Sequence, residues 1–194
     1  MNTLFRCLAL SPLLALVAAC CANSPCNRDD LQADSLYLTL SSRLTSPDTV
    51  NVSFTRSELD TVYLRRYSDS TVVTDPVLLL RTQRRDAALA AILLNAKLDA
   101  NTIVISNTTP FAPSTTGGKL NAYNYLLTVH DGVKGAKTYN FRLTDIMLTG
   151  AYEADGCCTY YHNTKKTLRV NHKAANDITA PVNLPIAVTL DKRL

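Results

Sequence analysis

Two adjacent cysteines and a histidine lie close together near the end of the sequence, and these residue types can carry redox or nucleophilic chemistry. Cys157 and Cys158 are followed by His162. The thiolate is the reactive form of cysteine, and a neighbouring cationic group lowers the pKa of a thiol. One hypothesis is therefore an envelope enzyme or redox protein that uses Cys157, Cys158 and His162.

The same residues, together with His172, are also of the types that bind zinc. Their spacing is not a recurrent zinc-ligand spacing, and vicinal thiolates rarely bind one metal well. We therefore predict no metal site and no cofactor. His130 stands beside Asp131 and Gly132, and we interpret it as a residue of a turn.

Motifs of common catalytic sites are missing from the sequence, including those of serine hydrolases, β-lactamases and zinc proteases. The segment 115–119 is rich in glycine and ends in lysine, but it lacks the first glycine and the hydroxyl residue of a phosphate-binding loop. Asp145, Glu153 and Asp155 could converge in the fold, but we interpret them as surface and turn residues. The sequence thus favours a protein that is not an enzyme.

Tyrosine is the residue type that best suits a binding surface here, because the chain has nine tyrosines and no tryptophan. Tyrosine offers both an apolar ring and a hydroxyl to a sugar or a peptide. Six tyrosines of the second half form the candidate binding set: Tyr123, Tyr125, Tyr139, Tyr152, Tyr160 and Tyr161. The alternative is that these rings fill cross-strand pairs inside the sheet.

The first 19 residues have the composition of a secretory signal. They carry one positive charge at Arg6, no acidic residue, and an apolar run that ends at the small residues Ala18 and Ala19. A membrane-spanning helix needs about 20 apolar residues, and this run is shorter. We therefore expect the chain to be exported.

The segment Val17-Ala18-Ala19-Cys20 resembles the lipobox of bacterial lipoproteins. The resemblance implies cleavage before Cys20 and acylation of its thiol, so that lipid chains such as palmitate anchor the protein. Cys21 also follows small residues, but it would place Cys20 at the position before cleavage, which fits less well. The residue after Cys20 is not aspartate, which in lipoproteins of this kind implies the outer membrane of a Gram-negative bacterium. The order of features along the chain is similar to that of uncharacterised small lipoproteins of the Bacteroidota, which brings no known activity.

Four cysteines remain in the mature chain if Cys20 is acylated: Cys21, Cys26, Cys157 and Cys158. An even number in an exported protein indicates disulfides, and four cysteines allow three pairings. A bond from Cys26 to Cys157 or Cys158 would close a long loop, whereas a bond between the adjacent pair needs a strained ring. We favour the first arrangement.

Charge and length restrict the class of protein. Without residues 1–19 the basic residues number 19 against 16 acidic ones, a balance of +3 that gives no clustered basic surface for nucleic acid. The basic pairs at 65–66, 84–85 and 165–166 are interpreted as solvated. The remaining 175 residues suit one domain, with residues 20–32 as lipid anchor and tether and 33–194 as the folded part.

The folded part has the alternating pattern of short strands. Apolar and polar residues alternate over 36–40, 50–54 and 137–148, and β-rich segments occupy 61–67, 71–74, 77–80, 159–161, 167–170 and 184–190. Residues 123–130 and 137–148, joined by a glycine-containing turn, are predicted to form a hairpin. Residues 86–98 have helical spacing but also fit a strand followed by a second strand at 102–105, and we favour the helix slightly.

These elements predict a mainly β fold, a single antiparallel β-sandwich with at most one short helix. We expect a lipid-anchored protein of the cell envelope, held to the bilayer by its N-terminal lipid. Its role would be binding or structural, with an envelope protein or polymer as the partner.

Overall fold

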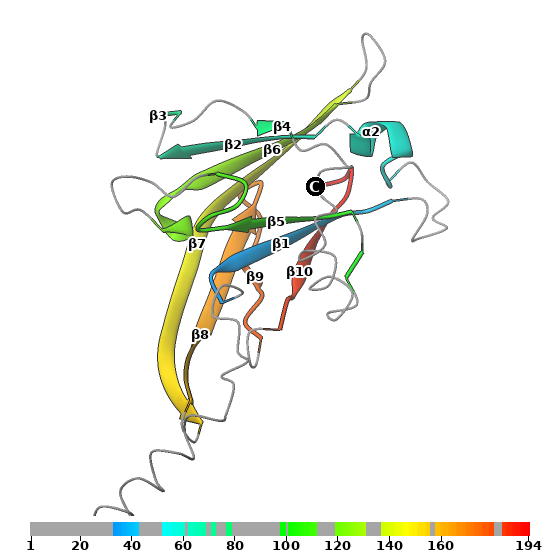
Figure 1. Ribbon diagram of the computed structural model, residues 1–194. Helices are drawn as coiled ribbons and strands as arrows, with labels where there is room; N and C mark the ends of the chain where they lie inside the picture. Colours follow the sequence, from blue (N-terminus) through cyan, green and yellow to red (C-terminus); the bar gives the residue numbers. More distant parts are fainter. Residues whose placement is uncertain are drawn as a thin grey trace, which may run out of the picture.

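The computed structural model describes residues 33–42, 52–60, 62–68, 71–72, 77–78, 98–99, 101–111, 119–130, 137–155, 158–180 and 184–194. These residues form two β-sheets, with one α-helix of five residues and a single 3-10 turn among them (Figure 1). The predicted mainly β fold, a sandwich-like arrangement, is confirmed. The segment 86–98, where helix and strand were weighed, lies outside the described residues except for Leu98, as does the region of the signal and tether.

The smaller sheet has three strands in the order β10 (Ala187–Leu190), β1 (Ser35–Leu40) and β5 (Thr102–Ser106). The central strand β1 runs parallel to β10 and antiparallel to β5. Leu36, Leu38 and Leu40 are fully buried, as their alternation predicts, but Tyr37 between them is buried as well. The strand is therefore covered on both faces over this part and is not half-buried.

The larger sheet has seven strands, all antiparallel. Its main path is β3 (Thr71–Val72), β2 (Val62–Ser68), β6 (Asn124–His130), β7 (Thr138–Asp155), β8 (Cys158–Val170) and β9 (Asn176–Asp177), and β4 (Val77–Leu78) pairs with β2. The predicted hairpin is confirmed as β6 and β7, although β7 continues seven residues beyond its predicted end.

The core lies between the two sheets. Buried apolar residues of the small sheet, such as Leu38 and Val188, join one cluster with Leu64, Leu127 and Leu143 of the large sheet. Phe54 enters this cluster from the segment before α2 and makes an edge-to-face contact with Phe141, with ring centroids 6.1 Å apart. Burial of this cluster removes apolar area from water and is the main force that holds the sheets together.

Two local predictions were wrong. In the segment 50–54, of which residues 52–54 are described, Phe54 forms only an isolated bridge to Ser42, and the chain then enters helix α2 (Arg56–Asp60). Thr55 and Glu58 form a capping box, in which Thr55 N donates to Glu58 Oε2 at 2.6 Å. The segments 159–161 and 167–170, predicted as separate strands, are both parts of the one strand β8.

Strands β7 and β8 extend well past the rest of their sheet (Figure 1). Strand β6 pairs with β7 only as far as Leu143, and β9 pairs with β8 only at Thr167 and Leu168. Residues 149–155 and 158–165 therefore pair only with each other among the described strands. We call this two-stranded extension the arm. No helix in the described part of the chain is long and apolar enough to cross a membrane.

Candidate functional site: the β7–β8 arm

Tyr152 and Tyr161 form an aromatic pair on one face of the arm. The two residues are directly opposite each other in the register of β7 and β8, and their ring centroids lie 5.2 Å apart at an interplanar angle of 62°. Tyr152 is 73% exposed, which is the largest exposure among the described large hydrophobic residues. An exposed aromatic ring that a neighbouring ring holds in place favours the recognition of a partner.

Glu153, Tyr160 and His162 form a polar cluster on the opposite face of the arm. The hydroxyl of Tyr160 donates to Glu153 Oε2 at 2.8 Å, and His162 Nε2 lies 3.6 Å from Glu153 Oε1. The rings of Tyr160 and His162 are 6.0 Å apart. The arm therefore presents tyrosine on both of its faces.

Gly150 allows the ring of Tyr161 to lie against the backbone where the arm leaves the sheet. A Cβ atom at position 150 would lie 2.2 Å from Tyr161 Oη and 2.7 Å from the carbonyl oxygen of His162. Lys119 Nζ lies 5.9 Å from the same ring, which is within the range of a cation–π contact. Burial and the negative charge of Asp34 raise the pKa of the Tyr161 hydroxyl.

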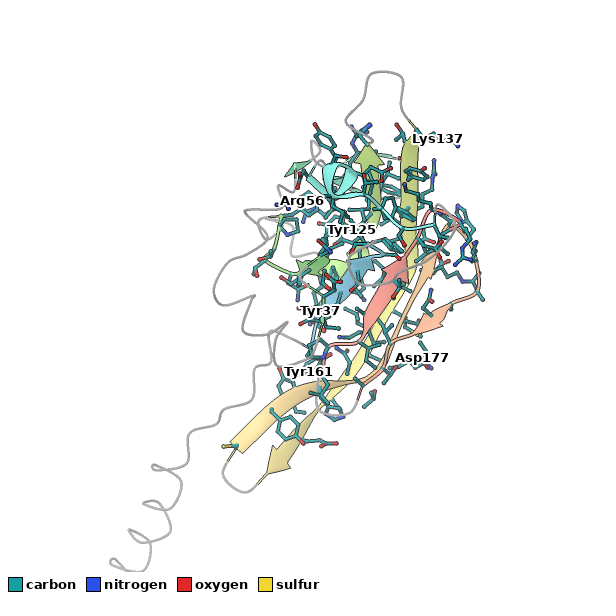
Figure 2. The ribbon with its side chains drawn as sticks, turned by 90° about the vertical axis from the view of Figure 1, so that its right-hand side faces the viewer. Tyr37, Arg56, Tyr125, Lys137, Tyr161 and Asp177 are labelled. Atoms are coloured by element: carbon teal, nitrogen blue, oxygen red, sulfur yellow. The ribbon has the colours of Figure 1, made fainter. Side chains whose placement is uncertain are left out.

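The structure divides the six candidate tyrosines into two groups. Tyr152, Tyr160 and Tyr161 lie on the arm, shown with its side chains in Figure 2. Tyr123 and Tyr125 are buried, and the Tyr125 hydroxyl donates to the carbonyl oxygen of Leu120 at 3.1 Å.

Tyr139 packs edge-on against Phe54 of the core, with ring centroids 5.4 Å apart. Tyr125 and Tyr139 point to the core side of their strands, and Tyr123 lies just before β6. The burial of Tyr123 and Tyr125 favours the alternative that these rings fill the interior, whereas Tyr139 is only partly buried, so its place in a binding surface stays a prediction.

Cys158 and His162 do not form a catalytic pair in this fold. They are four residues apart on the extended strand β8, a separation of about 13 Å along the strand. Cys158 is disulfide-bonded, and its partner lies outside the described residues, as do Cys21, Cys26 and Cys157. His162 contacts Glu153 instead.

The other histidines and acids singled out from the sequence lie on different strands and turns of the large sheet. His130 ends β6, His172 lies in the turn after β8 with φ 60°, and Asp145 on β7 is 3.5 Å from Arg169 Nε. Asp155 pairs in register with Cys158 at the tip of the arm. Within the described ranges, no three His, Cys, Asp or Glu residues gather closely enough to hold a metal ion.

Two polar residues at the base of the arm, Asn163 and Lys166, hold the start of β1, and the sequence pattern did not indicate this role. Asn163 Nδ2 donates to the carbonyl oxygen of Ala33 and, at 3.3 Å, to Asp34 Oδ1. Lys166 Nζ donates to the carbonyl oxygen of Ser35 at 3.0 Å. Both Asn163 and Lys166 are buried, so the interpretation of the pair Lys165–Lys166 as solvated holds only for Lys165.

Lys165 and Lys166 differ in burial because the pairing of β7 and β8 is irregular beside them. Thr149 pairs with Lys165, and the next residue, Gly150, pairs with Asn163, which leaves Thr164 as an extra residue in β8. A β-bulge of this kind shifts the alternation of side chains, so Asn163 and Lys166 point to the same side. A simple period of two cannot reveal this from the sequence.

The arm and its buried base are thus the structural features that distinguish this β fold. No family model matches the chain, and no curated protein or solved structure shows a significant match to it.

Proposed function

We propose that the chain is a lipid-anchored binding module of the cell envelope, acylated at Cys20, that contacts a partner protein through the arm. The observation that carries the proposal is the arm itself, a hairpin that continues beyond the sheet, where Tyr152 is exposed and Tyr160 and Tyr161 are half-buried. Tyrosine is enriched at the centres of protein interfaces.

The arm is already ordered before any partner arrives. Tyr152 packs on Tyr161, and Tyr160 is held by Glu153. Binding loses less conformational entropy when the contact residues are held in place beforehand. A two-stranded ribbon is marginally stable alone, so the buried contacts of Asn163 and Lys166 at its base support its use as a contact element.

The place where the tether joins the domain supports a partner near the membrane. Residues 20–32 of the proposed tether lead to Ala33, whose carbonyl oxygen is held by Asn163 at the base of the arm. Thirteen residues span at most about 45 Å. The base of the arm would therefore stay within that distance of the lipid, and we propose the outer membrane as the location.

We also propose that Cys158 is bonded to Cys26, as the favoured pairing predicts, so that the tether is fixed to the tip of the arm. Closing a loop of this length restricts the unfolded chain and is worth about 4 to 5 kcal/mol in the chain-entropy model. The redox or enzyme alternative with Cys157, Cys158 and His162 gains no support, because the imidazole contacts Glu153 and is far along the strand from Cys158.

The experiment is chemical crosslinking in intact cells that produce the full chain, with the captured proteins identified by mass spectrometry. The parent protein is compared with Tyr152→Ser and Tyr161→Ser, each of which removes one ring of the aromatic pair. Tyr67→Ser is the matched control, because Tyr67 is a half-exposed tyrosine on β2 in the same sheet but away from the arm. Cys20→Ala controls for membrane attachment.

The proposal predicts one envelope protein that is enriched with the parent and the Tyr67 variant and lost with both arm variants. Enrichment that survives both arm substitutions would assign the contact to another surface. A set of captured proteins no different from that of the Cys20→Ala control would contradict the binding role altogether.

A further inference from the structure

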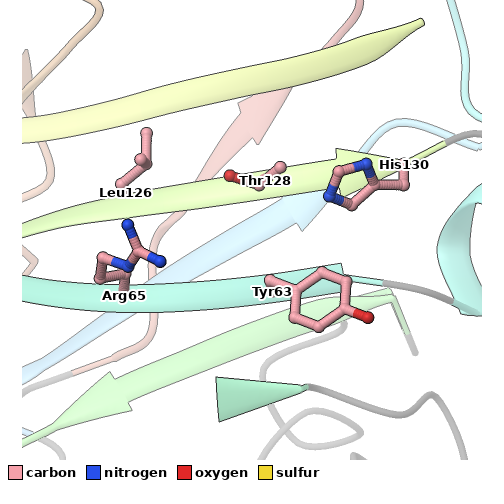
Figure 3. Close-up of a pocket in the computed structure, with 5 residues that line it drawn as sticks. All are labelled: Tyr63, Arg65, Leu126, Thr128 and His130. Atoms are coloured by element: carbon pink, nitrogen blue, oxygen red, sulfur yellow. The ribbon is translucent and has the colours of Figure 1, made fainter. Parts of the chain in front are cut away.

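A pocket lies on the outer face of the large sheet, away from the arm and from the core. Five half-buried residues line it, and Figure 3 shows how they come from two neighbouring strands: Tyr63 and Arg65 from β2, and Leu126, Thr128 and His130 from β6. In the register of the strands Tyr63 is opposite Thr128 and Arg65 is opposite Leu126. Their chain neighbours Val62 and Leu64 face the core.

The pocket has a volume of about 270 Å³. Sites for drug-sized molecules measure roughly 300–1,000 Å³, so this pocket suits one small polar unit such as a single sugar ring. It is a feature of two paired strands and is therefore formed without any movement of the arm.

The lining residues offer an aromatic wall and several hydrogen-bonding groups. The ring of Tyr63 meets that of His130 edge-on, with centroids 5.4 Å apart at 83°, so each ring fixes the orientation of the other. Thr128 Oγ1 donates to Asn140 Oδ1 at 2.9 Å, which also fixes that hydroxyl. An aromatic face beside fixed polar groups is a setting that a sugar ring can use, since its C–H surface packs on the ring and its hydroxyls bond to the polar groups.

Arg65 gives the pocket its charge. None of the five lining residues is acidic, and the next strand places Arg142 opposite Leu126, so a second arginine stands on the same face. Arg65 Nε is buried and has no hydrogen-bond partner among the residues that the structure describes. Arg65 as a whole is half-buried, and it is the one arginine or lysine among the five residues that line the pocket.

We propose that this pocket binds an anionic sugar unit, a hexose that carries a carboxylate or a phosphate group. The guanidinium of Arg65 pairs with the anionic group, which it can bind in a bidentate manner. Tyr63 supports the sugar ring, and Thr128 and His130 bond to its hydroxyls. This site is independent of the proposed contact of the arm with a protein.

The test is an NMR titration of the full chain, purified in detergent, with three probes: glucuronic acid, glucose 6-phosphate and glucose. The first two carry the two kinds of anion, and glucose is the neutral match. A charged hydrogen bond is worth about 1.5–3 kcal/mol, so at least one anionic sugar is expected to bind about tenfold or more tightly than glucose. Whichever anion binds identifies the chemical group.

Two variants assign the binding to the pocket. Arg65→Gln is expected to weaken binding of the anionic sugar about tenfold, and Leu126→Phe, which fills the pocket without a change of charge, is expected to weaken it as well. Arg169→Gln is the control for a positive charge elsewhere on the sheet, because Arg169 is an exposed arginine on β8, which contributes no residue to the pocket, and it should change the Kd by less than about threefold.

Binding of glucose as tight as that of both anionic probes would overturn the proposal, and so would the absence of binding by any probe. Unchanged binding in Leu126→Phe would also overturn it, and this variant remains decisive if Arg65→Gln fails to fold.

Discussion

Lys166 is a buried amine that the fold holds with few polar partners. Its side chain lies 7% exposed beneath the base of the arm, where Nζ donates to the carbonyl oxygen of Ser35. Burial lowers its pKa from 10.5 to about 8, although the negative charge of Asp34 acts in the opposite direction. Burial thus disfavours the charged form in the folded state.

This pKa makes stability depend on pH in a definite direction. Between pH 8 and 10.5 the unfolded chain binds the proton of Lys166 more strongly than the folded chain does, so the free energy of unfolding rises with pH in that window. Across this window the lowered pKa of Lys166 changes the free energy of unfolding by about 3 kcal/mol. Chemical denaturation at pH 7 to 10 should show this rise in the parent protein and not in Lys166→Met.

Lys165→Met is the matched control, because Lys165 is exposed and pairs with Asp177 on β9. Its pH profile should keep the rise that the parent shows. Other groups that titrate in the same range contribute equally to all three proteins, so the difference between the profiles isolates Lys166. Parallel profiles for the parent and Lys166→Met would rule out a lowered pKa of Lys166 in the folded state.

The residue type alone does not distinguish the buried Lys166 from the exposed Lys165. Composition and pattern treat Lys165 and Lys166 as one solvated pair, but the bulge at Thr164 separates their surroundings. The tyrosines show the same limit, since Tyr125 and Tyr152 have identical chemistry and opposite burial. Burial at a single position depends on register and on the partner sheet, which the sequence does not display.

At the scale of elements, the strands with clear alternation were predictable. Residues 123–130 and 137–148 form the hairpin as expected, because period-two alternation and a glycine-containing turn act together. The arm was not predicted as one element, since β8 carries a polar stretch in its middle and the bulge interrupts its pattern. The short helix α2 was missed although Thr55 and Glu58 have the spacing of a capping box.

Gly150 is the residue on which the geometry of the arm depends most directly. The substitution Gly150→Ala would place a methyl group against the ring of Tyr161 and the carbonyl oxygen of His162, and the latter belongs to the backbone of the paired strand. Excess volume in a packed position typically costs about 1–3 kcal/mol. We expect lower thermal stability and faster amide hydrogen exchange in residues 149–155 and 158–165.

A second substitution tests which contact is responsible. Tyr161→Ala in the Gly150→Ala background removes the clash with the ring but leaves the clash with the backbone, so it should restore part of the lost stability. Ala151→Ser, an exposed neighbour on the same strand, should leave amide exchange in the arm unchanged. Equal exchange rates in Gly150→Ala and the parent would contradict the close approach.

At the scale of the whole molecule, the fold class followed from the number of short alternating segments, while the assignment of each strand to one of the two sheets did not. The parallel pairing of β1 with β10 joins segments at opposite ends of the folded part, and no local pattern marks it. A buried ion pair also joins distant segments, since Lys192 Nζ, just after β10, lies 2.8 Å from Glu58 Oε1 of α2. Such long-range contacts form only when the chain ends meet.

The proposed tether meets the described fold at the base of the arm. Ala33 begins the described fold at the base of the arm and leads into β1 at the centre of the small sheet. With the proposed bond between Cys26 and Cys158, a load on the lipid would act first on the tip of the arm and not on the hydrogen bonds of Ala33.

Metabolic labelling with an alkyne analogue of palmitate should label the parent protein and Cys21→Ala but not Cys20→Ala, because Cys20 follows the small residues of the lipobox. Membrane fractionation of the same three strains should find Cys20→Ala released from the outer membrane, since the lipid chains supply about 0.8 kcal/mol of binding for each buried methylene group. Label that persists in Cys20→Ala and disappears in Cys21→Ala would move the anchor by one residue and shorten the tether accordingly. An unlabelled parent protein would contradict the lipid anchor. The proposed protein partner of the arm would then have to be one that is free of the membrane.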